Sequence, residues 1–206
     1  ANDNASRIKF ACKHYPRKAA PGTRWVYHTS DTYLLGEALG AFYRATAGDG
    51  SDFYNDVLAG PIWKKLALSP PVYVTRRTYD AAAEPFVGYG VTLHPDDVAK
   101  LAAFINVDHG AAGGEQLVDP AMLRAALQKN AADRGLPAPN DAFRYENGFW
   151  AWNARQTLGC KTQAWIPFMS GYGGIAVAMM PNGMTYYYFS DSGVWRWDKA
   201  AAEANR

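Results

Sequence analysis

The sequence predicts an α+β protein in which an antiparallel sheet is flanked by helices and joined to a helical region. Apolar residues recur at helical spacing through the first two thirds of the chain, and short runs of β-forming residues follow. An Asn182-Gly183 turn joins two of these runs as a tight hairpin. We therefore expect one α+β domain. It would be mainly helical over about residues 22–140, with sheet strands and a C-terminal helix over about 141–206.

The composition is that of a folded protein with a small-molecule or protein partner. Of the 206 residues, 49% are hydrophobic and 14% are aromatic, which is enough for a sizeable core. The net charge is +2 and the basic residues are scattered, so we expect no nucleic-acid partner. No run approaches the ~20 apolar residues that span a bilayer, so we expect no membrane segment.

Turn and capping residues set the boundaries of the predicted helices. Thr29, Ser30 and Asp31 are N-cap residue types, and Gly60-Pro61 is expected to end a helix. Residues 7–10 are interpreted as a short extended piece. Helices are predicted over 32–46, 52–59, 95–105, 119–127 and 195–205, with Met122, Leu123, Ala126 and Leu127 facing inward in the fourth.

Three strands are predicted near the C-terminus, over residues 149–152, 175–180 and 184–189. A sheet of only three such strands leaves an open edge, which is a template for pairing with another strand.

Tyr27 lies on a loop between the Pro21-Gly22 turn and the predicted 32–46 helix. A rigid helix directly behind such a loop can aim a side chain into a cleft. The alternative is that Trp25, Tyr27 and Tyr33 pack the edge of the core.

The stretch from Pro21 to Gly36 contains Pro-Gly-x-x-Trp-x-Tyr and ends in Leu-Leu-Gly. It resembles the serine β-lactamase, penicillin-binding protein and esterase superfamily around its second motif, Tyr-x-Asn. The resemblance places the motif tyrosine, a general base and proton relay in that family, at Tyr27. His28 then takes the middle position in the cleft, and Thr29 replaces the asparagine that contacts substrate.

A second stretch, from Phe168 to Pro181, resembles the third motif of the same family, Lys-Thr-Gly or His-x-Gly, on a strand that flanks the site. Met169 occupies the lysine or histidine position, and Ser170 and Gly171 complete the triplet. Methionine brings no positive charge. The resemblance implies that the N–H of Tyr172 donates to the oxyanion hole, and a main-chain donor survives changes of side chain.

The family's first motif, Ser-x-x-Lys, supplies its nucleophilic serine. Ser6-Arg7-Ile8-Lys9 has the right letters but stands only 21 residues before Tyr27, whereas the family inserts much of a helical domain there. We therefore expect the nucleophile to lie outside this chain. The resemblance also implies that residues 1–206 are one β-lactamase-like domain, incomplete at its N-terminus. A missing N-terminal segment, or another chain, would then complete the sheet.

The function expected from this resemblance is that of a serine hydrolase acting on an amide or ester through an acyl-serine, with this fragment inactive alone. The alternative is a non-catalytic binding module on the same scaffold, because His28, Thr29 and Met169 stand where the family usually holds its chemistry. A third possibility is a complete, aromatic-rich α+β binding domain.

We expect no cofactor and no metal, because clustered His and Cys residues are absent from the sequence. Cys12 and Cys160 are interpreted as thiols, with a disulfide as the alternative. The expected location is periplasmic or secreted, and a cytoplasmic location stays open.

Overall fold

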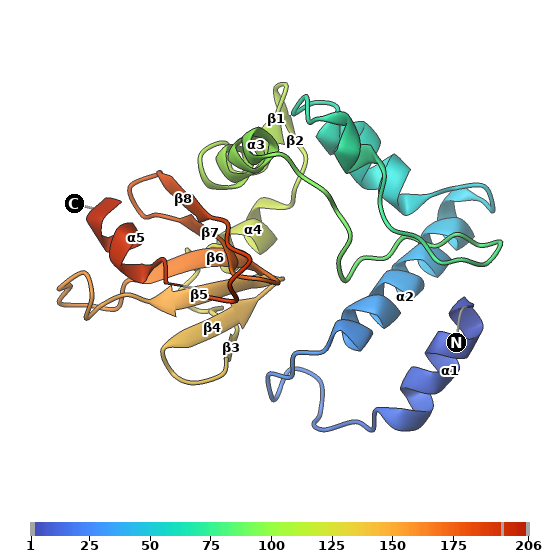
Figure 1. The fold of residues 1–206 in the computed structure, drawn as a ribbon, viewed down its shortest axis with the longest axis horizontal. Helices are drawn as coiled ribbons and strands as arrows, with labels where there is room; N and C mark the ends of the chain where they lie inside the picture. The colour runs from blue at the N-terminus through green and yellow to red at the C-terminus, as the bar shows by residue number, and fades with distance from the viewer. Residues whose placement is uncertain (1–2, 195, 205–206) are drawn as a thin grey trace. The chain divides into compact units, whose positions relative to one another are not determined.

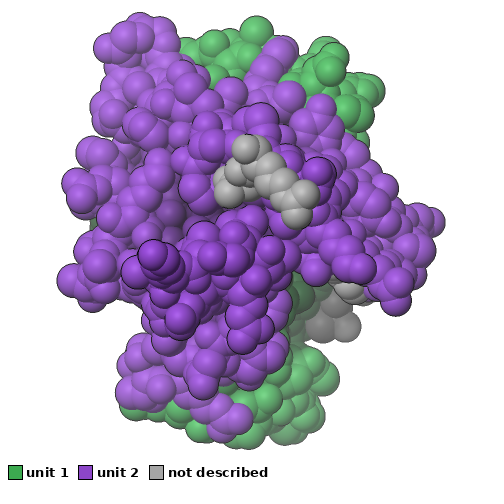
Figure 2. Space-filling model, turned by 90° about the vertical axis from the view of Figure 1, so that its left-hand side faces the viewer, with its two compact units in different colours: residues 1–20, 26–98 green, residues 21–25, 99–206 purple. Residues whose placement is uncertain are grey.

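The computed structural model describes residues 3–194 and 196–204, which form an α+β fold (Figure 1). The chain divides into two compact units. Unit 1 comprises residues 1–20 and 26–98, and unit 2 comprises residues 21–25 and 99–206 (Figure 2). Each unit is described by itself below.

Unit 1 begins with a helix that the sequence reasoning missed. The predicted extended piece at residues 7–10 is wrong, because these residues lie within α1 (Asn4–His14). Asp3 caps this helix by accepting a hydrogen bond from the Ser6 N–H at 2.8 Å. Lys13 and His14 in the last turn add favourable charge at its C-terminal end.

Helix α2 (Thr29–Ala47) is the predicted 32–46 helix, and it ends as expected at Gly48. It starts one turn earlier than expected, so Thr29, Ser30 and Asp31 lie in its first turn. His28 takes the N-cap position without a side-chain capping hydrogen bond. Gly36 lets the chain near Val87 approach closely, since a Cβ at Gly36 would lie 2.4 Å from Val87 Cγ2.

The predicted helix end at Gly60-Pro61 is wrong. A π-helix, η1 (Tyr54–Trp63), continues through Pro61, and the 3₁₀-helix η2 (Pro70–Tyr73) follows. The Lys64 N–H donates to the Ala59 carbonyl, five residues earlier, at 3.1 Å. Proline clashes with the carbonyl four residues before it in an α-helix, and the wider π-turn is compatible with its ring.

Helix α3 (Pro95–Asn106) begins at the predicted proline, and the boundary between the two units falls within it. Asp97 in its first turn is fully buried. Its carboxylate accepts hydrogen bonds from Ser69 N–H (2.9 Å), Ser69 Oγ (3.0 Å) and His94 N–H (3.1 Å). Asp97 therefore caps α3 and ties it to Ser69, the N-cap residue of η2.

Unit 2 contains an antiparallel sheet with the strand order β3-β4-β5-β6-β7-β8 (Figure 1). The strands are β3 (Leu136–Pro137), β4 (Phe143–Glu146), β5 (Phe149–Asn153), β6 (Trp165–Gly171), β7 (Ile175–Met179) and β8 (Thr185–Tyr188). Before them come a two-stranded sheet of β1 (Ala111–Ala112) and β2 (Glu115–Gln116), and helix α4 (Pro120–Ala126).

The three predicted strands are present as β5, β7 and β8, and the hairpin glycine Gly183 has φ +85°. The expected three-stranded sheet is nevertheless wrong, because β3, β4 and β6 extend it to six strands.

Helices pack on both faces of this sheet. On one face, Trp197 and Ala201 of the C-terminal segment pack with Ile166, Phe168 and small residues of β7. Helix α5 (Asp198–Ala204) forms that layer; the predicted 195–205 helix has both of its end residues outside the described part of the chain.

On the other face, Leu123 and Leu127 at α4 pack with Met179 of β7. Met122 is 57% exposed, so its predicted inward orientation is wrong. It precedes Leu123 by one position and therefore lies on a different side of the helix.

Cys12 and Cys160 are free thiols, and both are exposed. In the described part of the chain, no helix combines the length and apolar character needed to cross a membrane.

We predict that Asp97→Ala lowers the free energy of unfolding by about 2 kcal/mol, because it leaves the half-buried donors of Ser69 without their charged acceptor. Asp96, the exposed neighbour in the same helical turn, is the matched control. Asp96→Ala should cost less than about 1 kcal/mol, the range of a helix-dipole interaction. Urea denaturation followed by circular dichroism measures both. Equal losses for the two variants would contradict this role of Asp97.

Candidate functional site

The predicted site residues fall into two groups, each within one unit. Tyr27, His28 and Thr29 belong to unit 1, and the run from Met169 to Tyr172 belongs to unit 2. The structure brings the members of each group together. A shared site for the two groups stays a prediction.

Tyr27 is the second residue before α2, and its side chain is 54% exposed. His28 follows at the N-cap position, with its Nε2 atom 3.3 Å from the Lys18 Nζ atom and its ring 6.3 Å from that of Tyr15. The helix therefore fixes the main chain beside Tyr27 while the phenol stays accessible to a reactant.

Thr29 is the first residue of α2 and lines a pocket of about 400 Å³ in unit 1. Arg7, Tyr33 and Phe86 also line this pocket. A Cβ at Gly88 would lie 2.9 Å from the Thr29 Cγ2 atom, so the glycine-rich turn can pass close to the start of the helix. Tyr27 itself is not among the residues that line this pocket.

Met169 lies on the face of β6 that carries α4. It packs against the apolar cluster of Leu123, Leu127 and Met179. The position that holds lysine or histidine in the resembling family is therefore apolar both in its own side chain and in its surroundings. This position supplies no charge to a substrate.

Ser170, Gly171 and Tyr172 lie where β6 leaves the sheet. The paired register of β6 with β5 ends at Trp150↔Phe168, and its register with β7 ends at Gly171↔Ile175. Tyr172 stands just beyond this last pair, with its side chain 99% exposed. The main chain therefore turns away from both ladders here, through Gly173 and Gly174 with φ of +87° and +103°.

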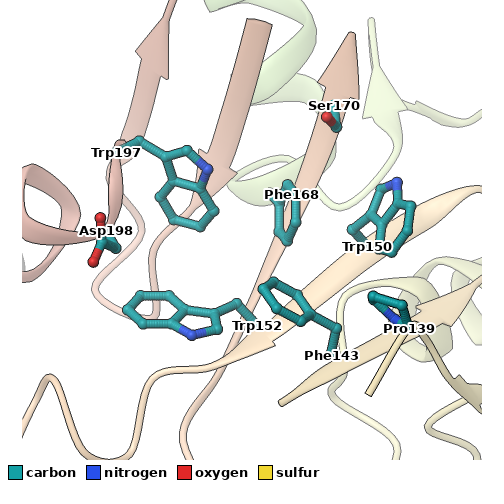
Figure 3. Close-up of a pocket in the computed structure, with 8 residues that line it drawn as sticks. All are labelled: Pro139, Phe143, Trp150, Trp152, Phe168, Ser170, Trp197 and Asp198. Atoms are coloured by element: carbon teal, nitrogen blue, oxygen red, sulfur yellow. The ribbon is translucent and has the colours of Figure 1, made fainter. Parts of the chain in front are cut away.

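An aromatic pocket of about 340 Å³ is drawn in Figure 3. Phe168 and Ser170 line it, and both alternate with Met169 along β6, so the pocket lies on the opposite face of the sheet from Met169. Ser170 lines it, together with Trp150 and Trp152 of β5. The sequence reasoning used these tryptophans only as evidence for a strand. Their spacing of two residues could have identified the pocket, because alternate residues of a strand face the same side.

Titratable side chains with shifted pKa values gather where α1 meets α2. Asn4 Nδ2 donates to the Glu37 carboxylate, the Tyr33 hydroxyl donates to Asn4 Oδ1, and the Asn4 N–H donates to Asp80 at 2.7 Å. Burial raises the pKa of Tyr33 to about 12. Burial also raises the pKa of Glu37, with a further rise from the charge of Glu84, against the lowering effect of the Asn4 hydrogen bond.

No protein-family model matches the sequence, and no curated protein sequence matches it either. The family resemblance therefore rests on the two motif-like stretches.

We predict that the free energy of unfolding of the native protein falls as pH rises through the folded pKa of Glu37, and that Glu37→Gln abolishes this fall. The folded pKa of Glu37 lies above its ordinary value of 4.5, so the folded state favours the protonated form. The native protein is therefore most stable, relative to the variant, below pH 4.5, and this advantage is lost as pH rises through the folded pKa. The variant keeps an acceptor for Asn4.

Thermal melting of both proteins from acidic to neutral pH measures this difference, with Glu115→Gln, an exposed site on β2, as the control. Parallel pH profiles for Glu37→Gln and the native protein would rule out a stability role for the Glu37 charge.

Proposed function

We propose that the protein is part of a serine hydrolase that cleaves an amide or ester through an acyl-serine intermediate. The observation that carries the proposal is the end of β6. There Tyr172 stands beyond the last paired residues of both neighbouring strands, and its main-chain N–H is offered as an oxyanion donor. Main-chain donors placed where negative charge develops supply a large part of the catalysis of acyl transfer.

The chemistry follows in two steps. A serine hydroxyl from a segment outside this chain passes its proton to the Tyr27 oxygen, which acts as the general base, and bonds to the substrate carbonyl carbon. The resulting oxyanion is held by the Tyr172 N–H, and the bond to the alcohol or amine leaving group then breaks as Tyr27 returns the proton. Water attacks the acyl-serine in the same way and releases the acid.

The substituted motif positions favour esterase, peptidase or small-amide hydrolase chemistry over penicillin turnover. Thr29 stands in place of the asparagine that binds a substrate amide, and Met169 in place of a cation. A substrate without a carboxylate to be neutralised suits such a site.

The alternative is a non-catalytic binding module on the same scaffold. The observation that favours it is the apolar packing of Met169 against Leu123 and Leu127. Labelling with a fluorophosphonate distinguishes the two functions, because only the hydrolase presents an activated serine.

The partner that we propose for the sheet is a further polypeptide segment, from the same protein or from another chain, paired with β8. This strand lies at the edge of the described sheet, and its sequence is Thr-Tyr-Tyr-Tyr, without the proline or lysine that commonly protects edges. Tyr187 and Phe189 are 41% and 44% exposed beside it. An added strand would satisfy the outer main-chain groups of β8 and cover these rings.

We predict that Tyr172→Pro lowers kcat for ester hydrolysis at least about 100-fold, because proline has no N–H to donate to the oxyanion. Tyr172→Ala keeps this N–H and is the matched control, so its kcat should stay within about threefold. The assay uses a p-nitrophenyl ester and the protein produced with its upstream reading frame. Equal losses for proline and alanine would show that the side chain acts, and not the amide.

We predict that Tyr27→Phe in the same assay costs about 100-fold or more in kcat, the usual contribution of a general base. Tyr79, which is 73% exposed in unit 1, offers the control Tyr79→Phe with an unchanged rate. An unchanged rate for Tyr27→Phe would exclude the phenol as the base. Failure of the fluorophosphonate to label any serine would instead favour the binding module.

The edge pairing is tested by hydrogen exchange. We expect the amides of β8 to exchange at least about 10-fold more slowly when the upstream segment is present, because edge N–H groups become hydrogen-bonded. The Leu136 amide of β3, at the other edge, is the internal control and should not change, since Pro137 has no N–H. Protection at β3 in place of β8, or at neither edge, would contradict the proposed pairing.

A further inference from the structure

The aromatic pocket of unit 2 is built by side chains on one face of the sheet. Phe143 of β4 is the cross-strand partner of Trp152 on β5, and Trp150 on β5 is the partner of Phe168 on β6. Cross-strand partners lie on the same face, so these four rings form one aromatic surface. Trp197, just before α5, adds a fifth ring from above this surface (Figure 3).

Trp150 and Phe168 are stacked, with an interplanar angle of 20° and centroids 6.2 Å apart, whereas the other ring pairs meet at steep angles. Trp152 and Trp197 have an interplanar angle of 85° with centroids 5.6 Å apart, and Phe143 and Phe168 meet at 70° with centroids 6.3 Å apart. Phe168 and Trp197 meet at 57° and 5.0 Å. Rings set at such angles wall a pocket from several sides, as Figure 3 shows.

The charge in the pocket lining is negative. Of the eight residues that line it, Asp198 is the one that carries a charge, and it lies on the side of Trp152 and Trp197 (Figure 3). Ser170 is the other side chain with a hydroxyl or carboxylate, and it lies farther along β6. The lining therefore offers a negative potential and, apart from Asp198 and Ser170, no side-chain hydrogen-bond acceptor.

We propose that this pocket binds an alkylated ammonium group. The faces of aromatic rings carry negative charge density and attract a cation within about 6 Å of the ring centroid, most strongly for tryptophan. The Asp198 carboxylate adds a direct electrostatic attraction. Alkyl groups on the nitrogen replace N–H donors that this lining would leave unsatisfied, and they bury apolar surface against the rings.

The other ligand classes fit less well. An anion would be repelled by Asp198 and by the ring faces. A neutral apolar molecule would gain the burial but not the electrostatic attraction. The volume of about 340 Å³ lies at the lower end of the range for small-molecule sites, which suits a compact headgroup.

Two sources present this chemistry, a free quaternary ammonium compound and a trimethylated lysine in a protein. Isothermal titration of the 206-residue chain with choline, and separately with a trimethyl-lysine peptide and its unmethylated counterpart, distinguishes them. The neutral isostere of choline, 3,3-dimethylbutanol, has the same shape without the charge. We expect choline or the trimethylated peptide to bind at least about 10-fold more tightly than its uncharged or unmethylated counterpart. Equal binding of choline and its isostere, or no binding of either cation, would overturn the proposal.

Variants locate the site. Asp198→Asn should weaken cation binding about fivefold or more without changing binding of the isostere, because it removes only the charge. Asp191→Asn, at an exposed aspartate of the same unit, is the matched control and should stay within about twofold. An effect of Asp191→Asn as large as that of Asp198→Asn would show a general charge effect and refute the site.

Trp152 is half-buried and can be varied in two steps. Trp152→Phe keeps a ring face, and Trp152→Leu keeps only apolar bulk; we expect a loss of affinity that grows from the first to the second. Circular dichroism of both variants checks that they are folded. Binding that survives unchanged in a folded Trp152→Leu variant would refute the aromatic contribution. Binding of a cation needs no nucleophilic serine, so the result does not depend on whether the protein is a hydrolase.

Discussion

The alternation of side chains along β6 is the constraint on which unit 2 depends. This strand is paired on both sides, and successive residues must face opposite sides of the sheet. Ile166 and Phe168 therefore join the core under α5, while Met169 joins the cluster under α4. A shift of one residue in register would exchange these two sets and place each against the wrong helix layer.

The same alternation decides what each residue near the end of β6 can do. Met169 is held in an apolar cluster, and Ser170 is turned to the aromatic pocket on the other face. The pairing of β6 with β5 ends at Phe168 and its pairing with β7 ends at Gly171, so Tyr172 is the first residue beyond both ladders. One strand thus supplies a packed residue, a pocket residue and a main-chain donor in sequence. This is why the hydrolase proposal relies on the amide at Tyr172 and not on the side chains of the triplet.

The sequence correctly predicted the helix ends and the turn that depend on neighbouring residues. Helix α2 stops at a glycine, α3 starts at a proline, and the Asn182-Gly183 turn joins β7 to β8, as expected. Helix α1 was missed because its sequence is polar and basic, and its cap, Asp3, was not considered. The π-helix was missed because proline predicts a break in an α-helix, and the change in hydrogen-bond pattern around Pro61 has no simple sequence signal. Strand β6 contains Pro167, which argues against a central strand.

The candidate site was predictable only in part, because nearby residues determine the conformation of each segment but not which segments come together. The local conformations around Tyr27 and Tyr172 follow from turn and strand signals close to each of them. The proposed action of both residues on one acyl group depends on contacts between distant parts of the chain, which no spacing rule encodes. The aromatic pocket likewise requires the register of three strands, although Trp150 and Trp152 show half of it in the sequence.

The central claim is that the Tyr27 phenol and the Tyr172 main-chain N–H act on the same acyl group. The most direct test is a crystal structure of the protein, produced with its upstream reading frame, after reaction with a fluorophosphonate. We expect the phosphonyl oxygen within about 3 Å of the Tyr172 nitrogen, and the Tyr27 hydroxyl within hydrogen-bond reach of the modified serine oxygen. A modified serine whose phosphonate contacts neither atom would contradict the account.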